Sequence, residues 1–584
     1  MSLRALTLGP RPNASGVLTA ALLSALLVLA FWVRSWGLAW DGFAALHPDE
    51  RHLFMVTGQM FTALADPAND GLGLADWWFA TTSPLNPHLG PKSYVYGEAP
   101  LLAGALVGWW WGAVDWFAYM PIARGLAALA DTTTVLAVFL GARLLSGNVP
   151  ALFAAILYAA MPSALQLANF HTVDVWLSAA STASLVPMIA LATGRWGRAG
   201  PMGMGALAGG FVGLAVACKV TGVLLLAPVV LALVLAVRAG LGWRRALAVL
   251  AVVLLVALIT FRLTNPFAFA GPGLWGLTLS EDWIADFQGL AVVTASPGFP
   301  PNWQWVAGYG PLRLLRDLTL FGFGPIAAAL IMGLRRNAVT AAAMIPLCVV
   351  LIFVALTAIS SVSALRYAAP ALGALAMALA PVFARLGGRI SVVALALALF
   401  WGAGAVRLHD GAHPRILASQ WLWSLPRGTV LTNETAWDDH LPTIVSLAEG
   451  EAYRWPSHDN WFTHQVLDIT DPDTPEKATR IAAQLAQTDY LILSSDRQSA
   501  VMPRLPDRFP MTTAHYRVLF SGQACFEPVQ VFDRGYPLPF LAFDDAWAQE
   551  PWRVYDHPVV RIYQRQPCYD EATYREMLLR ALGQ

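Results

Sequence analysis

The sequence predicts an α-helical protein that crosses a membrane many times and carries a soluble α/β domain at its C-terminal end. Three observations predict this. Of the 584 residues, 57% are hydrophobic and only 13% are charged, whereas soluble domains carry about 25% charged residues. Long apolar runs recur as far as residue 407, and charged residues become common only after it. The net charge is zero, which gives no indication of nucleic-acid binding.

The apolar runs define the expected membrane spans. A span needs about 20 predominantly apolar residues, and runs of this kind predict about eleven spans. They fall at residues 16–36, 122–142, 149–168, 173–193, 203–219, 221–238, 244–263, 313–334, 338–358, 365–384 and 390–407. The apolar segment 99–118 is different because it is rich in tryptophan, which prefers the membrane interface. We therefore expect it to lie in the interface.

Basic residues in the short connections predict the orientation. Each cluster is separated from the next by two spans, so all four clusters lie on one side of the membrane, which the positive-inside rule makes cytoplasmic. The clusters are Arg195 and Arg198; Arg238, Arg244 and Arg245; Arg335 and Arg336; Arg385 and Arg389. The N-terminus is then cytoplasmic. The first loop (37–121), the loop 264–312 and everything after residue 407 lie outside.

The polar C-terminal region, 408–584, predicts a small α/β domain that follows a membrane domain of residues 1–407. Its β-like runs surround a helix that opens at Asp473-Thr474-Pro475-Glu476, a sequence suited to a helix start. The runs lie at 429–433, 465–469, 490–494, 529–532 and 559–564. Cys525 and Cys568 can pair if this region is exported, and otherwise remain free thiols.

The stretch His47-Pro48-Asp49-Glu50-Arg51-His52 follows the first span and concentrates charge beside the membrane. Charge in such a place usually has a task. Neighbouring side chains on a helix point about 100° apart, so Asp49 and Glu50 are expected to have different roles. One of them can act as a general base that takes a proton from a hydroxyl. The alternative is a pair of solvated acids that cap a helix.

A divalent cation is a second hypothesis. His171 and Asp174 open a span on the same outer side with a spacing of three, which places them on one helical face, and Asp49 and His52 share that spacing. Mixed carboxylate and imidazole ligands suit several divalent metals. The alternative is that these residues are polar helix starts in a wet cavity.

Basic residues at the outer ends of spans indicate an anionic ligand. Positive charge on this face runs against the topological bias, and a lipid phosphate would explain it. The set is Arg124, Lys219, Arg262 and Arg366. Each side chain alone can equally reach the lipid headgroups. Asp131, inside a span, is expected to be structural, paired with a polar group in the bundle.

Tyr96 and Glu98 precede the interfacial segment. They can contribute to the same outer site, although Glu98 can also simply begin a helix, where negative charge is favoured.

Taken together and in order, several stretches resemble the GT-C superfamily of membrane glycosyltransferases. They are His47-Pro48-Asp49-Glu50-Arg51, Tyr96-Gly97-Glu98-Ala99-Pro100-Leu101, Arg124-Gly125-Leu126-Ala127, Asn169-Phe170-His171-Thr172-Val173-Asp174, Cys218-Lys219-Val220-Thr221-Gly222 and Leu365-Arg366-Tyr367. The chain looks most like the family 39 group, which includes protein O-mannosyltransferases and the aminoarabinose transferase of lipid A. Its C-terminal region ("Asp-Tyr-Leu-Ile-Leu-Ser-Ser", then "Val-Tyr-Asp-His-Pro") looks more like that of uncharacterised bacterial relatives.

The resemblance implies transfer of a sugar from a polyprenyl phosphate to an acceptor hydroxyl at the outer face of a bacterial inner membrane. It implies that Asp49 is the catalytic base, with Glu50 its neighbour, and that the membrane lipids surround the bundle. The acceptor stays open between a glycan, a lipid and a protein.

Two other functions remain possible from the residues. One is a transporter or lipid flippase with an exported binding domain, in which Asp131 and the outer basic residues form a path. The absence of an internal repeat and the clustering of acids on one face argue against it. The other is a sensor or scaffold, which leaves the acidic first loop unexplained.

Overall fold

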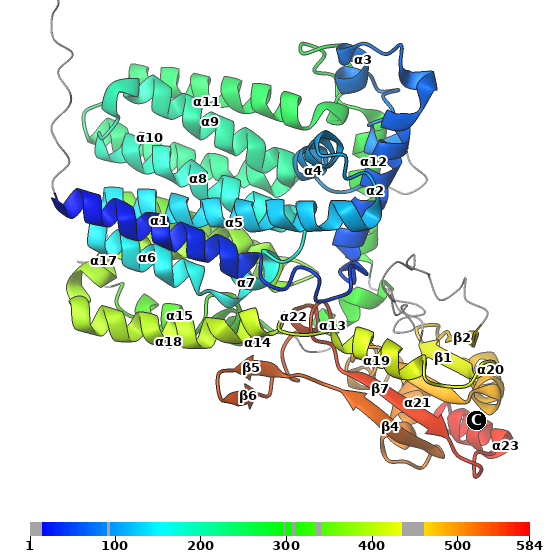
Figure 1. Cartoon of the computed structure of the whole chain (residues 1–584). Coiled ribbons are helices and arrows are strands. Elements are labelled where there is room, and N and C mark those ends of the chain that lie inside the picture. The colour runs from blue at the N-terminus through cyan, green and yellow to red at the C-terminus, as the bar shows by residue number, and fades with distance from the viewer. Residues whose placement is uncertain are drawn as a thin grey trace, which may run out of the picture.

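The computed structural model describes residues 14–89, 94–296, 298–306, 308, 310–334, 340–434 and 461–583. Within these residues, nine helices are long and apolar enough to cross a membrane, some of them with a short 3-10 turn included. They contain α1 (Ala14–Arg34), α5 (Trp116–Ser146), α8 (Val173–Thr193), α9 (Gly200–Cys218), α10 (Leu226–Arg238), α11 (Trp243–Thr264), α16 (Met344–Ile359), α17 (Ala369–Leu386) and α18 (Gly388–Arg407). They run side by side as one bundle (Figure 1) and correspond to nine predicted spans.

The two remaining predicted spans are broken helices. Residues 313–334 form α14 (Pro311–Asp317), a π-turn (Leu318–Gly322) and α15 (Pro325–Ile331), with a bend of 115° that would make a tenth span if the pair crosses together. Residues 149–168 form α6 (Asn148–Ala159) and α7 (Pro162–Leu167). Proline lacks the amide hydrogen needed inside a helix, and Pro325 and Pro162 each begin the second piece. The basic pair Arg335 and Arg336 lies outside the described residues.

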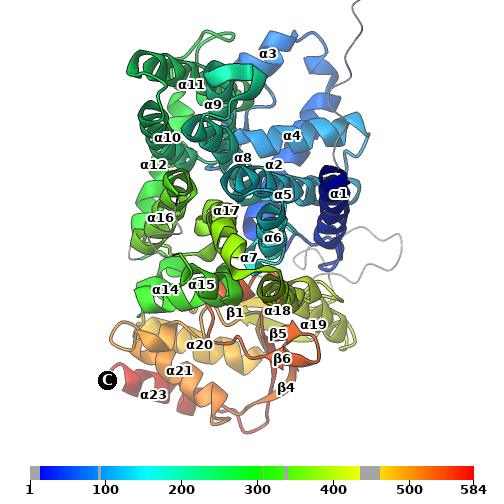
Figure 2. The same cartoon turned by 90° about the vertical axis from the view of Figure 1, so that its left-hand side faces the viewer.

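One end of the bundle carries the short helices of the first loop and of the loop 264–312. They are α2 (Pro48–Ala65), α3 (Leu74–Phe79), α4 (Glu98–Trp110), α12 (Glu281–Ala295) and α13 (Trp303–Val306). Helix α4 is seen end-on in Figure 1, where the spans are seen from the side, and from the side in Figure 2. With 13 residues it is about 20 Å long, too short for an apolar layer of about 30 Å. The interfacial position of this segment stays a prediction.

The polar C-terminal region contains a five-stranded sheet of order β2-β1-β3-β7-β4. Strand β1 is parallel to β2 and β3, whereas β7 is antiparallel to β3 and β4. The strands are β1 (Val430–Glu434), β2 (Thr463–Leu467), β3 (Tyr490–Leu493), β4 (Phe526–Phe532) and β7 (Val560–Arg565), so all five predicted strands are present. The helices are α19 (Pro414–Leu422), α20 (Pro475–Gln487), α21 (Pro510–Phe520), α22 (Glu550–Arg553) and α23 (Glu571–Ala581).

The sheet is covered by amphipathic helices. In α20, Ala478, Ile481, Ala482 and Leu485 recur at helical spacing and are buried against the sheet's core. Cys525 and Cys568, one just before β4 and the other just after β7, form a disulfide. This crosslink ties together the two strands at one edge of the sheet.

A hairpin joins the C-terminal region to the bundle. Strands β5 (Tyr536–Leu538) and β6 (Leu541–Phe543) extend from the sheet to α18 (Figure 1). The hydroxyl of Tyr536 donates to the carbonyl of Trp401, 2.8 Å away. The ring of Tyr536 approaches Gly404 so closely that a Cβ there would lie 2.5 Å from it. This contact needs a glycine, and it holds the α/β region against the end of the bundle where α18 ends.

Candidate active site

The acidic corner is created by the first turn of α2. His47 is the N-cap, Pro48 is the first helical residue, and Asp49 and Glu50 follow in the first turn, where the helix dipole favours negative charge. The ring nitrogen Nδ1 of His47 accepts a hydrogen bond from the backbone amide of Asp49 at 3.2 Å. Because adjacent helical side chains diverge, Glu50 points into the protein and is fully buried, whereas Asp49 remains 15% exposed.

Glu50 belongs to a sealed ion cluster. Arg124 on α5 donates two hydrogen bonds to Glu50 at 2.7 and 3.0 Å and two to Asp41 at 2.8 Å. A further N–H of Arg124 goes to the carbonyl of Leu38. The five donors of a guanidinium are thereby used, and none is left for a phosphate. Glu50 also accepts the amide of His171 at 2.8 Å. This cluster locks the first loop onto two spans, so it supports a structural role for Arg124 and Glu50.

Asp49 belongs to a second, more open cluster. Its carboxylate lies 2.6 Å from the guanidinium of Arg366, and Arg366 also approaches Asp174 at 3.9 Å. Lys219 pairs with Asp174 at 2.8 Å. The side chains of Arg366 and Lys219 are 18% and 26% exposed. The structure therefore gathers Asp49, Asp174, Lys219 and Arg366 from four separate stretches, with two cations accessible to an anionic ligand.

The surroundings of Asp49 keep it ionised. Burial alone would raise its pKa, but Arg366, His47 and a hydrogen bond from the hydroxyl of Tyr96 bring that pKa below its ordinary value. Burial, reinforced by the negative charge of Asp49, raises the pKa of Tyr96, so this phenol stays protonated and donates. Burial lowers the pKa of His47 to about 3, which makes its imidazole neutral at physiological pH. Tyr96 is thus a hydrogen-bond partner of Asp49.

Arg262 and Glu98 lie elsewhere. Arg262 donates to the carbonyls of Pro266, Gly271 and Gly273 at 2.6 to 3.0 Å. Its guanidinium also stacks against two phenylalanine rings at 4.8 and 4.9 Å. Glu98 begins α4 and accepts from Asn265 and from the amide of Phe267 at 3.2 and 2.9 Å. Both side chains hold the start of the loop 264–312 against the first loop, and Glu98 also begins a helix, which is one of the two roles expected for it.

The four residues of the predicted metal set do not come together. Asp49 and Asp174 are each matched by a cation, and His171 is enclosed by the rings of Phe54, Tyr119 and Trp176. Burial lowers the pKa of His171 to about 4. The ring of His52 packs on those of Tyr94 and Tyr96. In the described part of the chain, no group of three or more His, Cys, Asp or Glu side chains is arranged to hold a metal ion. The residues present do not fit one.

Asp131 is sealed within the bundle. Its carboxylate pairs with Arg34 of α1 and accepts a hydrogen bond from the hydroxyl of Tyr158 on α6. The side chains of Arg34 and Asp131 are only 1% and 2% exposed. The structural role predicted for Asp131 agrees with these contacts.

The C-terminal region contributes two residues that the sequence did not single out. The ring of Tyr555 stacks on His47 with 3.9 Å between ring centroids, and Arg366 lies 5.5 Å from the same ring. The side chain of Gln549 accepts from the amide of Leu365, next to Arg366, at 3.0 Å. A narrow cavity of about 10 Å³ is lined by these residues. The motif Val554-Tyr555-Asp556-His557-Pro558 was the available signal, but nothing in it indicates proximity to Asp49.

Comparisons with known proteins agree with this architecture. Residues 120–263 match the family model described as dolichyl-phosphate-mannose-protein mannosyltransferase. The archaeal oligosaccharyltransferase AglB from Archaeoglobus fulgidus, solved with an inhibitory peptide and a dolichol-phosphate, is 14% identical with a TM-score of 0.51; the match covers 91% of this chain and 74% of that chain. No curated protein matches the sequence.

Two structures of ArnT from Cupriavidus metallidurans are also similar. The apo state is 14% identical with a TM-score of 0.46, covering 94% of this chain and 98% of that chain. The structure bound to undecaprenyl phosphate is 17% identical with a TM-score of 0.43, covering 70% and 73%. The chain has the fold of a GT-C membrane glycosyltransferase. Its segment 120–263 is similar to the dolichyl-phosphate-mannose-protein mannosyltransferase family.

Proposed function

We propose that this protein transfers a sugar from a polyprenyl phosphate to an acceptor hydroxyl, and that Asp49 accepts the proton of that hydroxyl. One observation carries the assignment: of the two adjacent acids, Asp49 is partly exposed beside two accessible cations, whereas Glu50 is sealed against Arg124. The lipid phosphate is supported by the family match and by AglB, whose solved structure contains a dolichol-phosphate.

Arg366 and Lys219 are the groups that would hold the donor phosphate. Both lie at the ends of spans and remain 18% and 26% exposed, so a lipid phosphate can reach them from the membrane side. The bond between the anomeric carbon and the phosphate oxygen breaks, and the acceptor oxygen forms the new glycosidic bond. Negative charge grows on the leaving phosphate as its bond breaks, and fixed cations stabilise that charge most strongly in the transition state.

Binding of the donor would also prepare the base. Without a donor, Arg366 is the main charge that lowers the pKa of Asp49. A phosphate that attracts Arg366 weakens this effect, so the pKa of Asp49 rises and its carboxylate becomes a stronger base. The hydroxyl of Tyr96 holds the carboxylate in place meanwhile. Asp49 takes the proton of the acceptor, and the polyprenyl phosphate departs as the second product.

The location follows from the charge pattern. The short basic connections favour a cytoplasmic N-terminus, which places the Asp49 corner and residues 408–584 on the outer, periplasmic face of a bacterial inner membrane. The Cys525–Cys568 disulfide is consistent with an oxidising compartment. In this arrangement a periplasmic α/β domain lies next to the corner and can help to select the acceptor, which is a glycan, a lipid or a protein.

The decisive experiment is a transfer assay with purified protein in detergent and a panel of polyprenyl-phosphate sugars, with and without a divalent chelator. Asp49→Asn should keep the melting temperature and the binding of polyprenyl phosphate but lose transfer about 100-fold or more, since general bases contribute about 10²–10⁴ in rate. The exposed carboxylate Glu576 gives the matched control, Glu576→Gln, with unchanged transfer. Turnover by Asp49→Asn would disprove the assignment.

The assays with chelator test the metal hypothesis independently. Because Arg366 and Lys219 already pair with Asp49 and Asp174, we expect the chelator to cause no loss of activity. A loss that an added divalent ion restores would show that the ion displaces those pairs. The transporter alternative makes the opposite forecast for the acids. A transporter should tolerate Asp49→Asn better than it tolerates Asp131→Asn.

A further inference from the structure

A segment of the C-terminal region reaches the transfer site. Residues 549–558 connect the hairpin β5–β6 to β7 and include α22, and on the way they contact three membrane elements. The side-chain oxygen of Gln549 accepts a hydrogen bond from the backbone amide of Leu365, and the backbone amide of Gln549 donates one to the carboxylate of Asp317 at 3.2 Å. The ring of Trp552 stacks on Phe321 at 4.8 Å between centroids. This docking segment therefore packs directly on the stretch that presents Arg366.

Tyr555 is the member of the docking segment nearest the chemistry. Its ring lies flat on His47, with an angle of 25° between the planes. The guanidinium of Arg366 lies 5.5 Å from this ring and 5.8 Å from the ring of Tyr367. Arg366 thus has aromatic faces near it from two different parts of the chain, with Asp49 at 2.6 Å. A long, flexible side chain is thereby held in one orientation.

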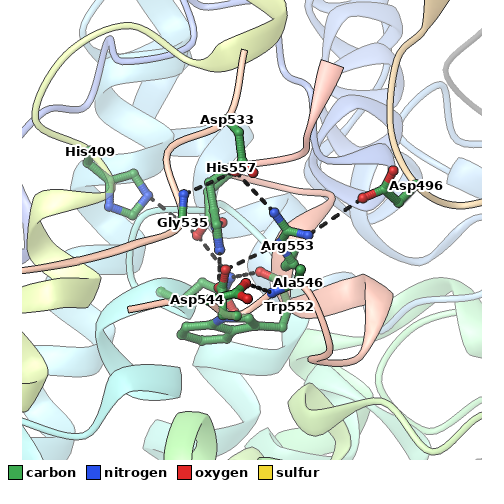
Figure 3. A network of polar contacts seen from close by, with 12 residues as sticks. His409, Asp496, Asp533, Gly535, Asp544, Ala546, Trp552, Arg553 and His557 are labelled. Carbon is green, nitrogen blue, oxygen red and sulfur yellow. Dashed lines mark hydrogen bonds and ion pairs between the residues drawn. The ribbon is translucent and has the colours of Figure 1, made fainter. Parts of the chain in front are cut away.

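A buried charge network fixes the docking segment. His557 lies between Asp545, at 2.7 Å from Nε2, and Asp556, which hydrogen-bonds to Nδ1. Asp556 also accepts from Gln166 of α7 at 2.9 Å, and the same amide donates to the carbonyl of Trp552 at 2.8 Å. Figure 3 shows His557 beside Trp552, with Arg553 reaching towards Asp496 and Asp533. All three members of the Asp545, His557 and Asp556 network are fully buried.

We propose that Tyr555 is a positioning residue of the transfer site, which orients Arg366 towards Asp49 and the donor phosphate when the C-terminal region is docked. This inference rests on the proposed function and deepens it. The ring attracts the guanidinium through its negative face and excludes water on that side. Prior orientation of a cation reduces the entropy that is lost when it binds an anion. The α/β region thereby couples its own docking to the binding of the donor.

The test uses the full-length protein and two readouts, the affinity for undecaprenyl phosphate and the rate of sugar transfer. Tyr555→Leu fills most of the space but has no aromatic face, and Tyr555→Phe keeps that face. We expect Tyr555→Leu to weaken binding of undecaprenyl phosphate about 3- to 30-fold, the range of a cation–π contact from exposed to desolvated. Tyr555→Phe should lose far less. Phe520→Ala removes an aromatic ring that is 49% exposed elsewhere in the region and should change neither readout.

Three results would overturn the proposal. One is unchanged binding and transfer in Tyr555→Leu. Another is an equal loss in Tyr555→Phe and Tyr555→Leu, because the hydroxyl would then matter and not the ring. The third is a loss of binding in Tyr555→Leu that is accompanied by a lowered melting temperature and is also seen in Phe520→Ala. Such a loss would be an effect on folding.

The two readouts separate this inference from the proposed function. If the wild-type protein transfers sugar and Tyr555→Leu behaves like it, only the role of Tyr555 falls. If the wild-type protein binds undecaprenyl phosphate in a Tyr555-dependent way but consumes no donor sugar in the presence of acceptors, the role of Tyr555 stands and the transferase assignment falls.

Discussion

The buried imidazole of His557 makes the stability of the docked C-terminal region depend on pH. Burial opposes its charged form, but Asp556 and Asp545 outweigh burial and raise its pKa to about 9. Both ring nitrogens face carboxylates, an arrangement that only the protonated imidazole can satisfy with two donors. The other charged or titratable groups nearby include Arg553, which pairs with Asp545, Arg534 and Tyr536, which face the same carboxylates, and the neutral rings of His409 and His413.

The magnitude follows from the two protonation equilibria. An unfolded histidine has a pKa of about 6.5, and one pKa unit corresponds to about 1.36 kcal/mol, so the shift to about 9 is worth about 3 kcal/mol. Because the folded-state pKa is the higher one, this stability is fully present below pH 6.5. It declines as the pH rises and is lost above about pH 9. For a domain of about 150–250 residues, 3 kcal/mol corresponds to about 6–12 °C in melting temperature.

The assay is thermal unfolding of the full-length protein in detergent, at steps from pH 6 to pH 10, for the wild type and for His557→Gln. Glutamine can keep one hydrogen bond but cannot carry the charge. We expect the variant to melt lower at pH 6 and the two curves to converge towards pH 10. Subtracting the variant removes the titration of groups that do not contact His557. Parallel curves across the whole pH range would refute the reasoning.

Two further predictions concern ionic and covalent crosslinks. Glu50→Gln should lower the melting temperature sharply, because removing one partner of a buried ion pair costs about 3–5 kcal/mol. Arg124 would keep Asp41 as its ionic partner. A stable, monodisperse Glu50→Gln protein that has lost only transfer would instead give Glu50 a chemical role. The two cysteines of the Cys525–Cys568 disulfide are 43 residues apart in the sequence. Reducing this disulfide should destabilise the α/β region by about 4 kcal/mol, which is the loop-closure value for such a separation. Thiol labelling before and after addition of reductant, followed by a melting measurement, checks this.

The spans and strands could be predicted because they depend on local pattern. Each of the five strands overlaps a short β-like run, and α20 begins at Pro475, inside the stretch predicted to open it. Thr474 caps the helix, and Asp473 pairs with Lys477. The helix breaks at Pro162 and Pro325 were missed because hydropathy averages over a window and does not register a change of direction.

The roles of the individual charges could not be predicted in the same way. Asp49 and Glu50 are adjacent acids in one helical turn, and their fates differ because Arg124 and Asp41 occupy the inner side of α2, a fact of tertiary packing. Arg124 and Arg366 likewise looked alike in the sequence, as basic residues near the ends of predicted spans; Arg124 lies inside α5, and Arg366 lies in the turn before α17. One is fully committed to buried partners and the other is accessible. Tyr555 reaches the site only because the hairpin β5–β6 and Trp552 dock the C-terminal region on the bundle.

The distribution of charge explains why one corner is suited to chemistry. Arg34 with Asp131, and Arg124 with Glu50 and Asp41, are closed pairs or clusters with side chains almost wholly buried. Each is expensive to open, since a buried charge without its partner costs several kcal/mol, so they hold the spans in register. Asp49, Arg366 and Lys219 remain partly hydrated. Exchanging a carboxylate for a phosphate there costs much less desolvation, and the rigid clusters around it keep the exchange local.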